Sequence, residues 1–273
     1  MVSLKEALEG ELTKKQLSLV PRSFDVVGDV LIFSEFPDGL KKKEKLIGET
    51  ILRIMKHVKV VCKKTKFHSG VFRTKKVKII AGEKRKTTLY KENGVRIGLN
   101  VETCYFSPRL SNERMRIAEL VKKRESVLVM FSGVAPYPLV IAKNSSAKEV
   151  YGIEISPFAH KLAEDNIKLN KANNIKLFLG DVKKVIPKLK KKFDRVIMPL
   201  PKSAEDFLDI ALKAVKKNGV IHFYDFLFEE DFDQAVDKIK KHCKKCEILG
   251  IVKCGQYSPR KFRICVDFKV LNK

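Results

Sequence analysis

Hydrophobic and polar positions follow a regular pattern over most of the 273-residue chain. From residue 127 onward, short apolar runs alternate with segments whose apolar residues recur every three or four positions. This is typical of strands alternating with helices. The expected strands are 127–131, 150–154, 175–179, 193–198 and 219–224. The expected helices are 136–144, 157–170, 203–216 and 230–242. The pattern predicts a mostly parallel α/β sheet with helices on both faces, and strands 247–253 and 261–270 at its edge.

The N-terminal part of the chain has a less regular pattern. The expected elements are helices over 4–17 and 45–56, two strands around Gly28-Asp29, strands over 57–62 and 70–73, and a hairpin over 87–99. Asn93-Gly94 is the turn of that hairpin. The composition shifts near residues 99–106, and a helix over 112–123 follows. We therefore expect a small basic α+β domain over 1–98 and a Rossmann-type domain over 99–273.

The charge balance points to a polyanionic partner. Lysine and arginine number 57 against 32 acidic residues, which gives a net charge of +25 at pH 7. A globular protein this basic is expected to meet RNA or DNA. The alternative is a lysine-rich surface that serves solvation alone. Because the lysine clusters recur in both halves of the chain, a broad basic face is expected rather than a charged tail.

The sequence contains no membrane or export signal. No apolar run approaches the roughly 18–20 residues that span a bilayer, and the N-terminus lacks a signal-peptide pattern. We expect a cytoplasmic monomer with no membrane partner. Cys243 and Cys246 have zinc-knuckle spacing, but the chain has no second Cys-x-x-Cys and His242 is the one histidine nearby. Buried or idle thiols are therefore favoured over a metal site.

Two apolar runs carry the candidate cofactor chemistry. One ends in the small-residue turn Ser132-Gly133, and the other ends in Glu154 about 20 residues later. The glycine allows close backbone approach, and the acid can bind ribose hydroxyls. An ordinary strand–turn–helix, with Glu154 serving the following helix dipole, is the alternative. Without G-x-G-x-x-G or a P-loop lysine, S-adenosylmethionine fits better than a dinucleotide or a triphosphate.

Further candidates lie where other expected strands end, because ligands of such sheets bind at the carboxyl ends of the strands. Asp181 follows one strand and Met198-Pro199 follows another. Asp181 can hydrogen-bond an adenine amino group, although a helix N-cap is nearly as good an explanation.

Nine motifs occur in one order along the chain and resemble a known family. They occupy residues 23–29, 70–73, 81–83, 90–94, 105–114, 130–134, 166–170, 219–224 and 257–260. The block Tyr105-Phe-Ser-Pro-Arg-Leu is the most specific of them. The series is similar to archaeal and eukaryotic tRNA guanine-37 N1-methyltransferases and their wybutosine-pathway relatives. The resemblance implies a small RNA-facing α+β domain followed by a Rossmann-type class I S-adenosylmethionine methyltransferase domain, and a tRNA anticodon stem-loop as partner.

The resemblance also assigns site residues. Glu113 matches the general-base glutamate, since guanine N1 carries a proton at neutral pH, and Arg73 matches an arginine that stabilises O6. Without the resemblance, Glu113 reads as a helix-start acid and Arg73 as a phosphate contact. Pro199 completes the catalytic candidates. The cofactor candidates are Phe106, Arg109, Phe131, Ser132, Gly133, Val134, Glu154, Ile155, Asp181, Val182 and Pro199.

Three positions depart from the family pattern. Val129 stands where the family usually has aspartate, Ala135 where it has a second glycine, and Pro199 where many members have an asparagine. Pro199 resembles a subgroup that also methylates C7 of the wyosine precursor.

Three hypotheses about function follow. The first is a methyltransferase that forms 1-methylguanosine at position 37 of tRNA. The second is an aminocarboxypropyl transferase of the wybutosine pathway, and the third is a non-catalytic tRNA-binding relative whose cofactor loop has decayed.

Overall fold

The computed structural model describes residues 2–70, 72 and 74–271, and its chain forms two units. One unit comprises Met1–Lys91 and Arg96–Pro108, and the other comprises Glu92–Val95 and Arg109–Lys273. The tip of one hairpin thus belongs to the second unit while its strands belong mainly to the first. The predicted boundary between residues 98 and 99 stays a prediction.

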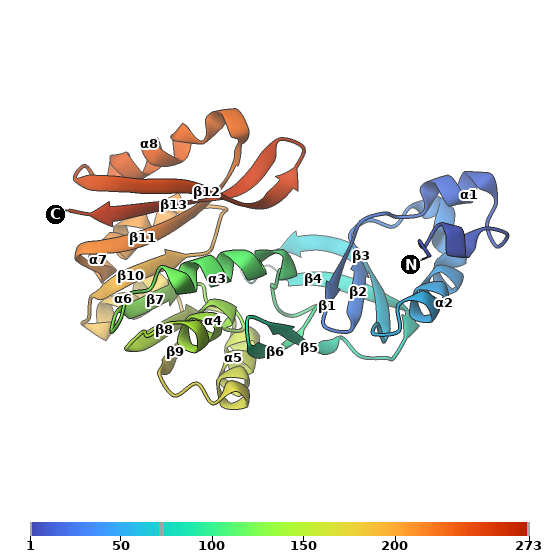
Figure 1. Ribbon diagram of the computed structural model, residues 1–273, viewed down its shortest axis with the longest axis horizontal. Helices are drawn as coiled ribbons and strands as arrows, with labels where there is room; N and C mark the ends of the chain where they lie inside the picture. Colours follow the sequence, from blue (N-terminus) through green and yellow to red (C-terminus); the bar gives the residue numbers. More distant parts are fainter. Residues whose placement is uncertain (1, 71, 73, 272–273) are drawn as a thin grey trace. The chain divides into compact units, whose positions relative to one another are not determined.

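The first unit is built on a four-stranded sheet in the order β1-β2-β3-β4 (Figure 1). Its strands are β1 (Phe24–Val27), β2 (Val30–Phe33), β3 (Val60–Ser69) and β4 (Thr74–Gly82). Helix α2 (Glu44–Ile54) packs on the sheet through Ile47 and Ile51, which are buried with Leu31 and Phe33. A short helix α1 (Lys14–Leu19) and a hairpin of β5 (Thr87–Glu92) and β6 (Val95–Asn100) complete the unit.

The second unit contains a seven-stranded sheet in the order β12-β13-β11-β10-β7-β8-β9. The strands are β7 (Ser126–Met130), β8 (Glu149–Glu154), β9 (Ile175–Leu179), β10 (Phe193–Met198), β11 (Val215–Phe228), β12 (Cys246–Ser258) and β13 (Lys261–Val270). The five from β7 to β11 run parallel, and β13 and β12 add antiparallel strands at one edge. Every residue of β7 is buried, as expected for a strand covered on both faces.

Helices cover both faces of this sheet (Figure 1). They are α3 (Ser111–Glu119), α4 (Pro136–Asn144), α5 (Pro157–Asn170), α6 (Val182–Leu189), α7 (Leu208–Ala214) and α8 (Asp233–His242). Crossovers between parallel strands are right-handed. Because the chain moves one way from β7 to β9 and the other way from β10 to β11, α4 and α5 cover one face while α6 and α7 cover the opposite face.

The predicted α/β class is confirmed, and most of the expected strands and helices are present. The expected helix over 4–17 is wrong: a 3-10 turn at Glu6–Leu8 and the separate α1 occupy it, with Gly10 at φ +86° between them. The expected strand over 70–73 is also wrong for Gly70 and Phe72, which lie in the turn between β3 and β4, while 71 and 73 lie outside the described residues.

Two elements were not expected from the sequence, and one helix is shorter than expected. β4 has buried Lys75 among its inward positions, and α6 contains Pro187, so each departs from its usual pattern. The helix expected over 203–216 begins at Leu208 and ends at Ala214. None of the helices in the described parts of the chain combines the length and apolar character needed to cross a bilayer.

The turn between β1 and β2 depends on a glycine. Gly28 has φ +60°, and a Cβ at this position would lie 2.2 Å from Oγ1 of Thr88 and 2.7 Å from the carbonyl oxygen of Leu89. The Thr88 hydroxyl is itself fixed, because it accepts from the Asp29 N–H at 3.2 Å and donates to Oδ1 of Asp29 at 2.8 Å. The neighbouring groups therefore have little freedom to move away.

Gly28→Ala is expected to lower the free energy of unfolding by about 3 kcal/mol, because a left-handed alanine and a steric clash act together. Gly10→Ala is the matched control. Gly10 has φ +86° but no atom within 4 Å of the added Cβ, so about 1 kcal/mol is expected. Urea unfolding of the full chain measures both. Equal losses in the two variants would contradict the clash at Gly28.

Candidate active site

The topology of the second unit creates a crevice at the carboxyl ends of its parallel strands. The chain leaves β7 toward β8 and β9 and later returns to β10, which pairs with the other side of β7. In open α/β sheets, ligands bind at such a switch point, outside the carboxyl ends of the strands. The loop 131–135 after β7 and Pro199 after β10 both border this point. The candidate residues from the sequence therefore gather on the expected side.

The loop 131–135 is tightly curved. Phe131, Gly133 and Ala135 have φ values of +59°, +57° and +67°. Gly133 adopts this conformation at no steric cost, whereas Ala135 and Phe131 hold it against their own Cβ atoms. Ala135 thus takes the left-handed conformation at the position where the family pattern has glycine.

Neighbouring elements hold this loop in place. The Ser132 N–H donates to the Ile153 carbonyl oxygen on β8 at 2.8 Å. The Asn166 side-chain amide on α5 donates to the Val134 carbonyl oxygen at 3.0 Å. The backbone of the loop is therefore fixed by β8 and α5.

Glu154, the last residue of β8, organises the centre of the site. Its Oε2 accepts from the Gly133 N–H at 2.7 Å, and its Oε1 accepts from the Ser156 N–H at 2.8 Å. Burial raises the pKa of Glu154, and these backbone donors partly offset the rise. Each carboxylate oxygen retains acceptor capacity, which suits a ligand with a pair of hydroxyl groups. Ser156, rather than Glu154, caps α5.

Ser132 provides a second polar group in the loop. Its Oγ is buried and has no hydrogen-bond partner among the described residues. Such a hydroxyl is unusual in a folded protein and is consistent with a polar ligand in this site. Gly152 on β8 lets the loop come close, because a Cβ there would lie 3.0 Å from that oxygen.

The remaining cofactor candidates of this unit surround the same edge. Asp181 caps α6 by accepting from the Lys183 N–H at 2.8 Å, so the N-cap explanation is realised. Val182 is buried, whereas Ile155 is 37% exposed beside Glu154. Phe131 packs edge-on against Phe207, with ring centroids 4.9 Å apart. Pro199 is half-buried at the end of β10.

The remaining candidates are Phe106, Arg109 and Arg73. Phe106 belongs to the first unit, where it is buried against Tyr90 with ring centroids 5.0 Å apart. Arg109 is exposed in the 3-10 turn Pro108–Leu110, of which Arg109 and Leu110 belong to the second unit. Arg73 lies outside the described residues.

Glu113 in the first turn of α3 is buried and tightly held. Its Oε2 accepts from Arg116 Nε at 2.7 Å, and its Oε1 accepts from Arg116 Nη2 at 2.8 Å. Oε1 also accepts from the Tyr224 hydroxyl at 2.5 Å. Burial and the nearby Glu113 charge raise the pKa of the Cys254 thiol on β12, which donates to the Val252 carbonyl oxygen at 3.4 Å. Glu113 is 5% exposed, so its orientation is set by side chains from α3 and β11.

A second carboxylate holds Arg116 from the other side. Nη1 of Arg116 donates to Oδ2 of Asp267 at 2.6 Å, and Oδ1 of Asp267 lies 2.5 Å from Nδ1 of His222. Nη1 of Arg195 lies 2.7 Å from the other ring nitrogen of His222. Because arginine can only donate, that nitrogen must accept, and Nδ1 carries the proton. His222 is thus assigned as the neutral tautomer.

The ionisation of this network follows from its contacts. Burial lowers the pKa of His222, in agreement with a neutral ring. Burial alone would raise the pKa of Asp267, but the hydrogen bond from His222 and the hydrogen bonds and charge of Arg116 hold it well below its usual range. Asp267 is therefore an anion that fixes Arg116.

Sequence reasoning missed this set of supporting side chains. Tyr224 and His222 fall inside a motif that carried the family resemblance, but the sequence assigned no role to either. Asp267 and Arg116 fall in no pattern that marked them as functional in the sequence.

His222, Cys265 and Asp267 could in principle ligate a metal ion, but Asp267 is already paired with Arg116 and His222. All six cysteines are free thiols.

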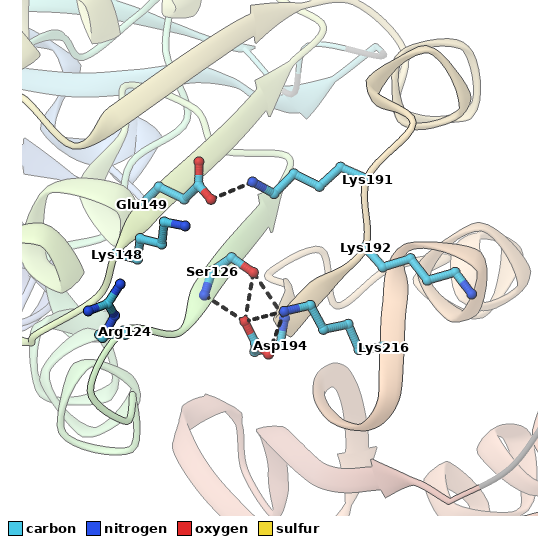
Figure 2. A pocket seen from close by; sticks show the side chains of 8 residues that line it. All are labelled: Arg124, Ser126, Lys148, Glu149, Lys191, Lys192, Asp194 and Lys216. Atoms are coloured by element: carbon cyan, nitrogen blue, oxygen red, sulfur yellow. Dashed lines mark hydrogen bonds and ion pairs between the residues drawn. The ribbon is translucent and has the colours of Figure 1, made fainter.

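A basic hollow of about 290 Å³ lies at the opposite edge of the sheet, where β7, β8 and β10 begin (Figure 2). Asp194 accepts there from the N–H and hydroxyl of Ser126 and from Lys216, and Lys191 pairs with Glu149. The other lining residues are Arg124, Lys148 and Lys192. Because it opens at the amino ends of the strands, this hollow is separate from the switch-point crevice and is not the cofactor candidate.

Comparison with known proteins gives consistent matches over nearly the whole chain. The family model described as the TRM5/TYW2 methyltransferase domain matches residues 88–250, and the TYW2 N-terminal domain matches residues 4–86. The tRNA (guanine(37)-N(1))-methyltransferase Trm5b of Pyrococcus abyssi is 40% identical over 256 residues, which cover 92% of this chain and 76% of that protein. A tRNA(Phe) (4-demethylwyosine(37)-C(7)) aminocarboxypropyltransferase of Methanocaldococcus jannaschii is 32% identical, over 90% of this chain and 97% of that protein.

Solved structures agree with these sequence matches. A complex of aTrm5 and tRNALeu superposes with a TM-score of 0.88 at 37% identity, covering 99% of this chain and 78% of that one. TYW2 of M. jannaschii in complex with AdoMet gives a TM-score of 0.69 at 26% identity, covering 90% and 98%. The predicted Rossmann-type methyltransferase fold and the family resemblance are both confirmed. The chain belongs to the TRM5/TYW2 methyltransferase family.

Proposed function

We propose that this chain is an S-adenosylmethionine-dependent tRNA methyltransferase that forms 1-methylguanosine at position 37, acting in the cytoplasm as a monomer. The observation that carries the proposal is the buried, oriented Glu113 carboxylate beside the carboxyl ends of the sheet strands. Methylation of guanine N1 requires removal of a proton, and a positioned carboxylate is suited to accept it. The 40% identity to Trm5b supports the same reaction.

The residues around loop 131–135 fit an adenosyl cofactor. Ser132, Gly133 and Glu154 offer an unpaired hydroxyl, a close backbone approach and acceptors for ribose hydroxyls. Asp181, Val182 and Ile155 stand at the neighbouring strand end and are proposed to contact the adenine side. S-adenosylmethionine supplies the electrophilic methyl group. Phe106 and Arg109 remain proposed contacts on the strength of the resemblance.

Glu113 is proposed to accept the N1 proton. In its present arrangement Arg116 and Tyr224 donate to the carboxylate. Oε1 accepts from both, whereas Oε2 accepts from Arg116 Nε and keeps capacity for a further donor, such as the guanine N1–H. Arg116 and Tyr224 then keep the carboxylate pointed at the base. Arg73 is proposed to stabilise charge on O6, as the resemblance implies.

Aminocarboxypropyl transfer is the second candidate. The 32% identity to the M. jannaschii aminocarboxypropyltransferase supports it. Retention of Glu113 favours methyl transfer, because N1 of unmodified guanine is the acceptor that needs a base.

Pro199 offers no N–H to the guanine edge, so methylation of the wyosine precursor at C7 is proposed as a further reaction of the same site. A decayed, non-catalytic loop is the third candidate, and Val129 and Ala135 are the features that support it.

Purified protein with labelled S-adenosylmethionine is expected to methylate an unmodified tRNA transcript with G37 and not the same transcript with A37. Nucleoside analysis of the product identifies 1-methylguanosine. A gain of the larger aminocarboxypropyl group would transfer the assignment to the second candidate. Failure to bind S-adenosylmethionine at all would favour the non-catalytic relative.

Glu113→Gln is expected to lower the rate of methyl transfer at saturating substrates by roughly 10²–10⁴-fold, because the amide cannot accept the proton. The affinity for S-adenosylmethionine should stay unchanged. Glu119→Gln, at the exposed end of the same helix, is the matched control and should keep full activity. A Glu113→Gln protein that is folded by circular dichroism and fully active would exclude Glu113 as the base.

Glu154→Gln is expected to weaken S-adenosylmethionine binding about tenfold or more. The amide N–H₂ would face a backbone N–H, and the remaining hydrogen bonds lose their charge assistance, each worth roughly 1.5–3 kcal/mol. Calorimetric titration measures the affinity. Glu149→Gln, at the opposite end of β8, should bind normally. Equal weakening in both variants would indicate a general loss of fold.

A further inference from the structure

The strands at one edge of the second unit extend past the rest of the sheet. The last residue of β11 that pairs with β10 is Phe223, whereas β11 continues to Phe228 beside β13. The β12–β13 hairpin accompanies it, and Figure 1 shows this hairpin reaching beyond the neighbouring strands. The extension lies at the carboxyl end of β11, which is the same end of the sheet at which Glu113 and the cofactor candidates lie.

Aromatic side chains gather on this extension. The rings of Phe226 and Tyr257 have centroids 4.5 Å apart, and the Arg263 guanidinium lies 5.0 Å from the Phe226 ring centroid. Tyr257 is 58% exposed although it is backed by Phe226. Lys261 lies 5.1 Å from the ring centroid of Phe228, which is itself 41% exposed. Large aromatic rings are thus presented to solvent with cations beside them.

A local irregularity of the sheet presents Tyr257. The pairing of β12 with β13 shifts register between Gln256 and Ser258, so Tyr257 falls in the irregular position. Such bulges re-aim a side chain and are frequent beside active sites. The turn of the β12–β13 hairpin is also anchored, since the Glu229 N–H donates to the Arg260 carbonyl oxygen at 3.0 Å. Tyr257 is therefore exposed by a defined backbone rather than by a loose tail.

The charge of the hairpin indicates the chemistry of its partner. Residues 253–263 contain Lys253, Arg260, Lys261 and Arg263 and no acid. Lys253 pairs with Glu229, and Arg260 pairs with Glu230 at 3.3 Å. Exposed aromatic rings on a cationic hairpin match an unpaired nucleobase with its phosphate, because bases stack on aromatic rings while the nucleic-acid backbone contacts positive charge. An apolar peptide would gain nothing from these cations.

We propose that Tyr257, which is backed by Phe226 and shares its hairpin with Arg263 and Lys261, is a stacking platform for an unpaired base of the tRNA next to the methylated nucleotide. The inference rests on the proposed function for the identity of the RNA. A base whose N1 is modified must leave its stack, so its neighbour loses a stacking partner. Tyr224, which donates to Glu113, and Phe226 lie two residues apart on β11 and therefore on the same face. The platform supplies a replacement stacking partner close to Glu113, the proposed general base.

The test measures binding of unmodified G37 tRNA to the full-length protein, separately from methyl transfer. Tyr257→Ala is expected to raise the Kd about tenfold, which is within the range for loss of one base–aromatic stack. Tyr257→Phe should bind within twofold of the parent, whereas Tyr257→Leu, which keeps bulk without a π-face, should behave like alanine. Leu249→Ala, at a 51% exposed position on the same strand, is the matched control.

The position of the base is tested with 2-aminopurine next to nucleotide 37. Its fluorescence should be quenched on binding to the parent and to Tyr257→Phe, and not to Tyr257→Ala. Binding to a fully double-stranded RNA should not depend on Tyr257. Unchanged Kd and quenching in Tyr257→Ala would overturn the platform, as would a dimer in sedimentation that Tyr257→Ala dissociates without affecting tRNA. S-adenosylmethionine affinity, which should be equal in all variants, distinguishes loss of the platform from failure of the proposed function.

Discussion

The buried ion network around Arg116 is the constraint on which the proposed chemistry depends. Removing charges from water is costly unless each one meets an opposite charge with good hydrogen-bond geometry. Arg116 lies between the carboxylates of Glu113 and Asp267, and neutral His222 links Asp267 to Arg195. Loss of one partner from such a network commonly costs about 3–5 kcal/mol. The network therefore ties α3 to β11 and β13. Contacts with the sheet thus fix the orientation of the Glu113 carboxylate.

Loop 131–135, the proposed cofactor loop, is held by a separate set of hydrogen bonds at the same end of the sheet. Glu154 accepts two backbone N–H groups, and Asn166 fixes the other side of the loop through the Val134 carbonyl oxygen. Neither contact involves the Arg116 network. A parallel sheet allows this separation, because each strand end can position one functional group from its own neighbours. The residues proposed for cofactor binding and those proposed for proton removal can therefore be altered independently.

The sequence predicted the parallel part of the fold well because its apolar runs are short and its helices are amphipathic. It missed β4, where buried Lys75 breaks the alternation of apolar and polar residues, and α6, where Pro187 interrupts the helical pattern. Both are cases in which tertiary contacts override local preference. The helix expected over 4–17 failed because three leucines at helical spacing outweighed Gly10 in the interpretation, although Gly10 adopts φ +86°.

For the site, sequence motifs identify residues that act locally along the chain. Ser132, Gly133 and Glu154 follow two consecutive strands, so their proximity could be predicted. Glu113 was identified by resemblance alone. Its partners could not be found in this way, because Asp267 reaches Arg116 through the antiparallel pairing of β13 with β11. That pairing is non-local, and no periodicity in the sequence encodes which residues it brings together.

The pairing of β11 with β13 also connects the two halves of the proposed chemistry. Along β11, Tyr224 contacts Glu113 and Phe226 contacts Tyr257, and their partners on β13 are Cys265 and Arg263. In the proposed chemistry, alternate residues of one strand thus serve proton removal and base stacking on a single face. A strand locked into a ladder cannot shift one of these side chains without the other. The proposed stacking surface and the proposed general base are therefore set by the same register, which makes the spacing between them a property of the sheet.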